Sequence, residues 1–250
     1  MAITIKSERE IELMAEAGKI LERVHNELEK ALHPGMSTKD IDTLGEEIIR
    51  SYGCIPSFLN YNGYPASICV SVNQEVVHGI PDKHRIIHEG DIVSLDAGVI
   101  YKGYHSDAAR THAVGEVSEE AKKLIQVTKE CFFEGIKYAK AGNHLFDISG
   151  AIGRYAEERG YGVVRDLCGH GIGTALHEDP QIPNYAQKRR GVRLQAGMTL
   201  AIEPMINAGT WQVRFLRDGW TVVTKDGSLS AHYENTILVT DGEPEILTLY

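Results

Sequence analysis

Apolar positions recur at helical spacing in four segments of the chain, separated by glycine- and proline-containing turns. Ser7 and Glu10 form a capping-box pattern in front of the first segment, and Ser37 opens the second, which Gly53 ends. Such amphipathic patterns are typical of helices that cover a core. The predicted helices cover residues 8–32, 38–52, 118–140 and 146–159.

Shorter apolar runs follow each pair of predicted helices and favour β-strands. No low-complexity segment or linker divides the chain, and 250 residues can form one large domain. The sequence therefore predicts an α/β (α+β) domain that spans residues 1–250. The predicted strands cover residues 66–72, 92–99, 104–112, 161–166, 198–204, 211–215, 220–224 and 232–240.

The repeated order of helices and strands indicates an internal duplication. A shift of 107 positions aligns GDIVSLDAG (90–98) with GMTLAIEPM (197–205) and places Asp96 on Glu203. A shift of 127 positions aligns HSDAARTHAVG (105–115) with HYENTILVTDG (232–242) and places Asp107 on Glu234. We predict two pseudo-repeats, at about residues 5–115 and 118–248.

Charge and composition exclude several classes of protein. The formal net charge is −9 and no run of Lys or Arg occurs, so neither nucleic-acid binding nor attachment to an anionic membrane is expected. No apolar run approaches the ~20 residues of a membrane span, and the charged start MAITIKSEREIE does not resemble a secretory signal. The cysteines form no CxxC pair, which favours reduced thiols in a cytoplasmic protein: Cys54, Cys69, Cys131 and Cys168.

The four aligned acids carry the first chemical signal. Asp96 and Asp107 flank a turn through Tyr101–Gly103, and we expect this hairpin to bring both carboxylates to one end of a strand pair. Four converging acids with no evident Lys or Arg partner in these segments would repel one another strongly. Bound cations would compensate this repulsion, so the acids predict a metal site. The alternative is an acid cluster that is mononuclear or purely structural.

The stretch CGHGIGTALHEDP (168–180) adds an imidazole to this set. It matches neither the P-loop pattern nor GxGxxG, so a phosphate-binding loop is not favoured. His170 between Gly169 and Gly171 could approach a metal closely. Oxygen-rich ligation with one histidine favours Mn, Fe or Co over a structural Zn site, and two such ions can share a hydroxide. The sequence therefore predicts a paired-metal hydrolytic site.

Several motifs together make the chain resemble a known family over about residues 4–248. It is similar to the type I methionine aminopeptidases, within the pita-bread metallopeptidases. The resemblance implies a curved antiparallel sheet that is built from two pseudo-repeats and covered by helices. The motifs are YNGYPASICVSVNQEVVHGIP, SLDAGVIYKGYHSDAARTHAVG, CGHGIGTALHEDPQIPNY, GMTLAIEPM and SAHYENTILVT.

The resemblance also implies roles for particular residues. Glu203 would move the proton of the attacking water, His78 would contact the scissile peptide or leaving group, and His177 would hydrogen-bond the oxyanion. From the residues alone, His78 could instead be an exposed imidazole in a turn. His177 could be a loop side chain that bonds to a backbone carbonyl. Two divalent ions (Co, Mn, Fe or Zn) and the hydroxide that attacks the carbonyl would be held by Asp96 (bridging or bidentate), Asp107, His170, Glu203 and Glu234.

A pocket for the methionine side chain follows from the same resemblance. Phe58 stands where a cysteine is frequent and Leu176 where an aromatic residue is frequent, so the shape of the pocket would differ in detail. Asn73 and Ser230 would contribute to a site for one monovalent cation. The implied pocket residues are Phe58, Tyr61, Tyr64, Cys69, His78, Leu176, His177 and Trp220.

The implied activity is removal of the initiator methionine from nascent proteins whose second residue is small. We expect a cytoplasmic monomer that contacts the ribosome transiently and binds neither nucleic acid nor membranes. Two alternatives stay open: a proline-directed aminopeptidase or dipeptidase of the same fold, and a non-catalytic member that binds peptides or ribosomes.

Overall fold

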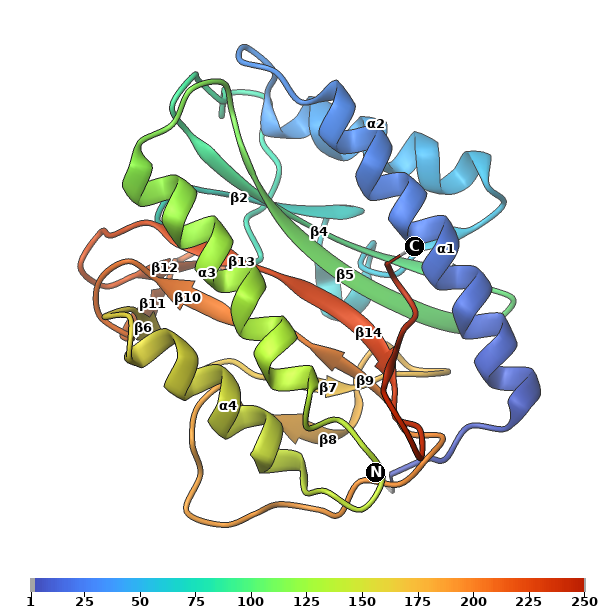
Figure 1. The fold of residues 1–250 in the computed structure, drawn as a ribbon. Coiled ribbons are helices and arrows are strands. Elements are labelled where there is room, and N and C mark those ends of the chain that lie inside the picture. Colours follow the sequence, from blue (N-terminus) through green and yellow to red (C-terminus); the bar gives the residue numbers. More distant parts are fainter. Residues whose placement is uncertain (1–2, 250) are drawn as a thin grey trace.

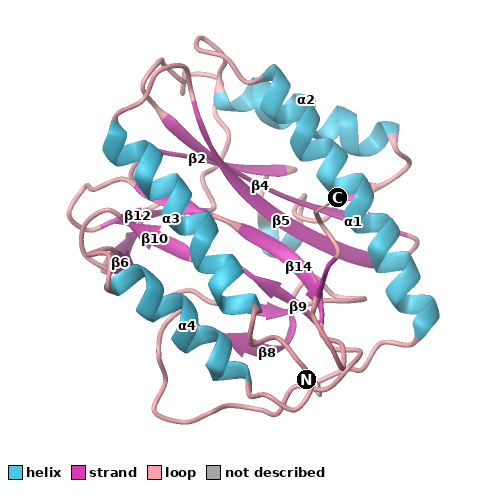
Figure 2. Ribbon diagram, viewed as in Figure 1, coloured by secondary structure: helices cyan, strands magenta, loops and turns pink. Residues whose placement is uncertain are grey.

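The computed structural model describes residues 3–249 and shows four helices on one face of a central antiparallel sheet (Figures 1 and 2). Within the described residues, no helix is both long and apolar enough to cross a bilayer. The helices are α1 (Glu8–Ala31), α2 (Thr38–Ser51), α3 (Glu119–Ile136) and α4 (Leu145–Glu157), with a 3₁₀ turn at Tyr61–Gly63.

The strands form one large sheet and two small ones. The large sheet has the order β1-β4-β5-β14-β9-β7-β8, with β2 added on β4 and β15 on β14. The small sheets have the orders β13-β10-β6 and β11-β12-β3. The strands are β1 (Ile55–Pro56), β2 (Ile68–Val72), β3 (Glu75–Val77), β4 (Ile92–Tyr101), β5 (Tyr104–Ala113), β6 (Gly162–Val163), β7 (Gly169–Gly171), β8 (Glu178–Ile182), β9 (Thr199–Ile202), β10 (Met205–Asn207), β11 (Val213–Phe215), β12 (Val222–Thr224), β13 (Ser230–His232), β14 (Glu234–Leu238) and β15 (Glu245–Ile246).

The large sheet is ordered symmetrically about the contact between β5 and β14. The hairpin β4–β5 comes from the first half of the chain, and β14 and β9 come from the second. Outside them, β2 pairs with β4 and β7 pairs with β9. Two halves of related topology would produce this order, and the duplication itself stays a prediction.

Each half of the chain buries its own apolar cluster between helices and sheet. In the first half, Leu21 of α1 and Ile49 of α2 pack with Val93 of β4. In the second, Phe132 of α3 and Ile148 of α4 belong to the cluster that reaches β14. Because side chains alternate along a strand, the residues between these apolar positions face the opposite side of the sheet, away from the helices.

The helix predictions are confirmed, with one change of length. The side chain of Glu10 accepts hydrogen bonds from the backbone N–H and the hydroxyl of Ser7, so the capping box at the start of α1 is present. Helix α3 ends at Ile136 rather than at residue 140, because the chain turns there and brings Lys140 into a bridge with Thr240.

Each of the eight predicted strands overlaps an observed strand, but the described residues form fifteen strands, so the number and the extent both differ. The predicted strand 232–240 is divided at Tyr233, because β13 pairs with β10 in a small sheet while β14 pairs with β5 and β9. Only residues 162–163 of the predicted strand 161–166 pair as β6. Strands β7 and β8 lie in the CGHGIGTALHEDP region, where no strand was predicted.

Candidate metal centre and substrate pocket

Asp96 and Asp107 lie side by side on the face of the sheet opposite the helices. In the β4–β5 register, Asp96 is opposite Ala109, and Asp107 is opposite Gly98. The predicted pairing through a hairpin is therefore correct, but the predicted position at a strand end is wrong. Asp96 lies in the middle of β4, because the hairpin continues for several pairs on both sides of the carboxylates.

The second half of the chain adds two acids to the same place. Glu234 begins β14 and is opposite Ala109 of β5, while Glu203 directly follows β9. Burial raises the pKa of Asp96 to about 7. Burial, followed by the other negative charges, raises the pKa of Asp107, Glu203 and Glu234 well above the usual range. The structure thus brings together four acids that resist ionisation until a cation compensates them.

The acids are poorly satisfied by the protein itself. One carboxylate oxygen each of Asp96, Asp107 and Glu234 is buried without a hydrogen-bond partner among the described residues. The expectation of no nearby cation was wrong in one respect, because Arg110 lies beside Glu234. Its guanidinium donates to the backbone carbonyl of Glu234 and, at 2.6 Å, to the side-chain oxygen of Asn235 rather than to a carboxylate.

His170 is presented to the acids by the short strand β7. A Cβ atom at Gly171 would lie 2.2 Å from the carbonyl oxygen of Asp179, so only glycine lets β7 pass this close to the neighbouring backbone. The Nδ1 atom of His170 bonds to the carbonyl of Gly171 at 2.9 Å. Its Nε2 atom therefore faces the acids with a free lone pair, 3.6 Å from Glu203 and 3.9 Å from Asp107.

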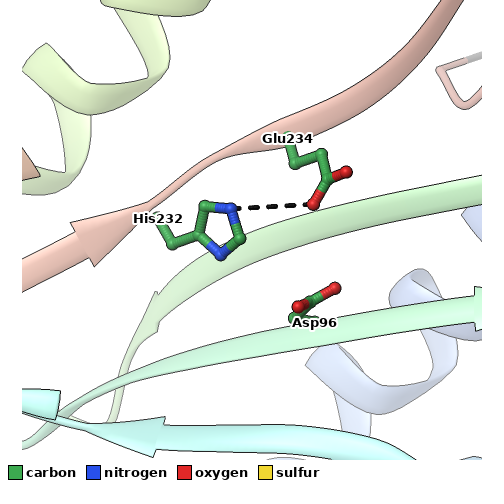
Figure 3. A group of neighbouring side chains, drawn as sticks. All are labelled: Asp96, His232 and Glu234. Carbon is green, nitrogen blue, oxygen red and sulfur yellow. Dashed lines mark ion pairs between the residues drawn. The ribbon is translucent and has the colours of Figure 1, made fainter. Parts of the chain in front are cut away.

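A second imidazole, which the sequence analysis missed, lies on the other side of the acids. His232 at the end of β13 has its Nε2 atom 3.6 Å from an oxygen of Glu234 and 3.8 Å from one of Glu203 (Figure 3). Burial lowers the pKa of His232 to about 3, with the charges of His78 and Arg110 adding to this effect. Its position two residues before Glu234 was the signal that could have revealed it.

These donors form two groups that suit divalent ions. In each group one ligand atom per residue lies within 4.8 Å of the others: Asp107, His170 and Glu234 form one group, and Asp96, His232 and Glu234 form the other. Carboxylate oxygens with imidazole nitrogens are a usual donor set for first-row divalent metals. Such ions would satisfy the buried carboxylate oxygens that lack partners in the same cluster, so the residues fit the predicted cofactor.

All of the residues predicted to bind the divalent metals or the substrate line one cavity of about 140 Å³, whereas Asn73 and Ser230 do not. The cavity combines an apolar wall with a charged floor, and Asn62 is the lining residue that the sequence analysis did not name. Its lining residues are Phe58, Tyr61, Asn62, Tyr64, Cys69, His78, Asp96, Asp107, His170, Leu176, His177, Glu203, Trp220 and Glu234.

The apolar wall is rigidly held. Tyr64 is buried, and its hydroxyl donates to the carbonyl of Gly79 at 2.9 Å, so its ring rather than its hydroxyl serves the cavity. The ring of Trp220 meets that of Tyr64 edge-on at 5.1 Å. Asp218 accepts hydrogen bonds from the backbone of Trp220 and Thr221, which fixes the turn that carries the indole.

The two remaining histidines stand at the rim. His78 follows β3 with a positive φ of 60°, and its ring meets that of Trp220 edge-on at 6.3 Å. His177 is exposed, and its Nδ1 atom bonds to the hydroxyl of Tyr61 at 2.7 Å instead of to a backbone carbonyl. His177 and His170 also touch, with ring centroids 4.3 Å apart. Both rim histidines therefore border the cavity rather than serve only a turn or a loop.

Comparison with known proteins agrees with this geometry. The chain is 59% identical to the methionine aminopeptidase of Clostridium acetobutylicum over 99% of both sequences. It superposes on the crystal structure of the methionine aminopeptidase of Thermotoga maritima with a TM-score of 0.97 and 48% identity, over the whole of both chains. An Xaa-Pro dipeptidase of Bacillus anthracis gives a TM-score of 0.78 at 28% identity, and the chain covers 62% of that protein.

These similarities confirm the predicted pita-bread fold and the resemblance to methionine aminopeptidases. The profile of metallopeptidase family M24 matches residues 12–241, which is most of the chain. The chain belongs to metallopeptidase family M24.

Proposed function

We propose that the chain is a metallo-exopeptidase that removes the N-terminal methionine from proteins whose second residue is small. The observation that carries the proposal is the single cavity in which an apolar, sulfur-containing pocket adjoins the acids and the rim histidines. Full-length similarity to methionine aminopeptidases supports the same substrate. The reaction breaks one peptide bond by addition of water, so no redox cofactor is needed.

Two divalent ions would be held by Asp96, Asp107, His170, Glu203 and Glu234. Glu234 belongs to both donor groups of the structure, so it would help to hold both ions. When bound, the ions would supply Lewis acidity that lowers the pKa of a water and polarises the scissile carbonyl. Their identity among Co, Mn, Fe and Zn is left to experiment.

Glu203 holds the proton that leaves the attacking water. Its side chain is 13% exposed, against 5% for Asp107 and 3% for Glu234, and is therefore more accessible than these two carboxylates. Burial and the charge of Asp96 raise the pKa of this carboxyl in the metal-free protein, and a raised pKa suits a group that accepts a proton from water. The same proton can pass to the leaving amine, which completes the hydrolysis.

His177 and His78 orient the substrate from the rim. With the Tyr61 hydroxyl donating to Nδ1 of His177, the neutral ring carries its proton on Nε2 and can donate to the developing oxyanion. Burial lowers the pKa of His78 to about 4, with the charge of His177 adding to the effect, so His78 acts as a neutral hydrogen-bonding group.

The methionine side chain occupies the apolar part of the cavity. The rings of Tyr64 and Trp220 and the thiol of Cys69 provide surfaces that suit a polarisable thioether. Phe58 and Leu176 complete the wall. These assignments rest on the lining of the cavity and on the family resemblance.

The proposal also includes a site for a monovalent cation and a location and role of the protein in the cell. Ser230 donates its backbone N–H to the carbonyl of Asn73 at 2.9 Å, so these two candidates for a monovalent site are neighbours. We further propose a cytoplasmic monomer that acts in protein maturation, with transient ribosome contact and no nucleic-acid or membrane partner. The net charge of −9 supports the last point.

Peptide cleavage by the metal-free protein, titrated anaerobically with Mn²⁺, Co²⁺ or Fe²⁺, tests the function. We expect release of methionine from Met-Ala-Ser only after metal is added, slower release from Met-Leu-Ser, and no cleavage of a Gly-Pro peptide. Cleavage of the proline peptide would favour the proline-directed alternative. Metal binding without cleavage of any peptide would favour the non-catalytic alternative.

A further inference from the structure

His232 is a buried imidazole that the protein leaves without a partner. Its side chain is 2% exposed, and neither ring nitrogen has a hydrogen-bond partner among the described residues. An unpaired buried polar group costs free energy, so it calls for a ligand or an ion. His105, which aligns with His232 in the predicted duplication, differs because its Nδ1 atom bonds to the hydroxyl of Ser57 at 2.9 Å.

The free imidazole is aimed at the acids. Its Nε2 atom lies 3.6 Å from Glu234 and 3.8 Å from Glu203, which is too far for a hydrogen bond. Two metal–ligand bonds of about 2.1 Å can span such a gap when both atoms bind one ion. Figure 3 shows His232 and Glu234 on one segment of chain, with the carboxylate of Asp96 on β4, beyond the intervening strand β5.

The two donor groups then have the same composition. One contains His170 with Asp107 and Glu234, and the other contains His232 with Asp96 and Glu234. We propose that His232 is a sixth ligand of the metal centre, so that each of the two ions has an imidazole of its own. This inference rests on the proposed two-metal function and adds a ligand to it.

A second imidazole has a consequence for the choice of metal. Nitrogen donors favour the later first-row ions more than carboxylates do, so His232 should strengthen Co²⁺ binding more than Mn²⁺ binding. Substitution should leave the strand in place, because Thr111 holds the backbone of His232 through hydrogen bonds to both its N–H and its carbonyl.

Calorimetric titration of the metal-free protein with Co²⁺ and with Mn²⁺ measures this effect. We expect His232→Gln and His232→Ala to raise one of the two Co²⁺ dissociation constants by at least about 10-fold, with a smaller change for Mn²⁺. His112→Gln is the matched control, since His112 is a mostly buried histidine on β5 whose ring contacts Glu29 instead of the acid cluster. This control should bind both ions as the wild type does.

X-ray absorption of the Co²⁺-loaded protein counts the imidazoles that bind the metal. The count for the wild type does not depend on how the variants fold. We expect two imidazoles per chain in the wild type and one in His232→Gln. A count of one imidazole in the wild type would overturn the proposal while leaving the two-metal site intact. So would Co²⁺ and Mn²⁺ dissociation constants that the His232 substitutions do not change. A wild-type protein that binds no Co²⁺ would instead refute the proposed function.

Discussion

Glu203 differs from the other acids of the cluster in its surroundings. Asp96, Asp107 and Glu234 lie within strands whose backbone is paired on both sides. Glu203 follows the last residue of β9 and precedes Pro204, where the chain leaves the large sheet. Because Glu203 lies outside the paired part of β9, its side chain can take part in proton transfer as well as in metal binding. The other three carboxylates are fixed by their strands.

Glu203→Gln should therefore reduce kcat by about 10²- to 10⁴-fold while the fold persists, because the amide cannot carry the proton of the attacking water. Steady-state cleavage of Met-Ala-Ser, with circular dichroism as the check on folding, measures this. Near-normal turnover in a folded variant would remove Glu203 from the proton-transfer role.

The pair of Tyr61 and His177 makes a second prediction at this scale. His177→Ala should lower kcat by about 10²-fold or more and change KM little, since its hydrogen bond strengthens as the oxyanion forms. Tyr61→Phe should lower kcat less, because the imidazole remains and only its preferred tautomer is lost. Separate determination of kcat and KM for both variants is the measurement. A change confined to KM would make His177 a ground-state binding residue.

Among the elements, strands β7 and β8 show where sequence patterns fail. The Gly-rich segment around His170 has low strand propensity, and its pairing depends on contact with β9, which is remote in sequence. Asp96 and Glu203 were found because their surroundings repeat along the chain. His232 lies in the same aligned segment, but it is paired there with a histidine rather than with an acid, and its carboxylate neighbours come together only in the folded sheet.

The loop after β7 carries Leu176 and His177, and the N-terminal segment holds it. Lys6 and Glu178 form an ion pair at 2.8 Å, with side chains 4% and 8% exposed. Burial by itself would raise the pKa of Glu178, but hydrogen bonds from Lys6 and Thr4 lower it below the usual value. The N-terminal segment therefore helps to position a residue of the rim.

Lys6→Met should destabilise the protein by about 2–4 kcal/mol, because it leaves the carboxylate of Glu178 without a cationic partner and with only the hydrogen bonds from Thr4 and Ala175. Lys6→Met combined with Glu178→Leu should recover much of this loss. Lys137→Met, which breaks an exposed pair with Glu134, should change stability by less than about 1 kcal/mol. Urea denaturation compares the variants. Equal effects at Lys6 and Lys137 would contradict the importance of the buried pair.

At the scale of the whole molecule, the symmetric sheet concentrates negative charge where its two halves meet. Each half contributes two acids to the junction, and the second half also contributes the imidazoles of His170 and His232. Such a junction is unfavourable for the metal-free chain and favourable once cations bind, so stability and metal binding are linked.

The linkage predicts a pH dependence with a definite sign. The four carboxyls have raised pKa values in the folded protein, Asp96 at about 7. Their contribution to stability is complete below the unfolded pKa of about 4 and is lost as pH rises through the folded values. The buried histidines have lowered pKa values, and their opposite effect ends once unfolded histidine is neutral, above about pH 6.5.

The metal-free protein should therefore lose stability as pH rises from about 6.5 through 7, by about 1.4 kcal/mol per pH unit for each carboxyl that still holds its proton. Saturating Co²⁺ should reverse the trend, because the metal binds the deprotonated ligands and its affinity rises with pH. Thermal melting of chelator-treated and Co²⁺-loaded protein across this window tests both statements, with Glu203→Gln expected to flatten the metal-free curve. A metal-free Tm that stays constant or rises would show that the four acids do not share protons in the folded state, and that the junction is not under the electrostatic strain inferred from its burial.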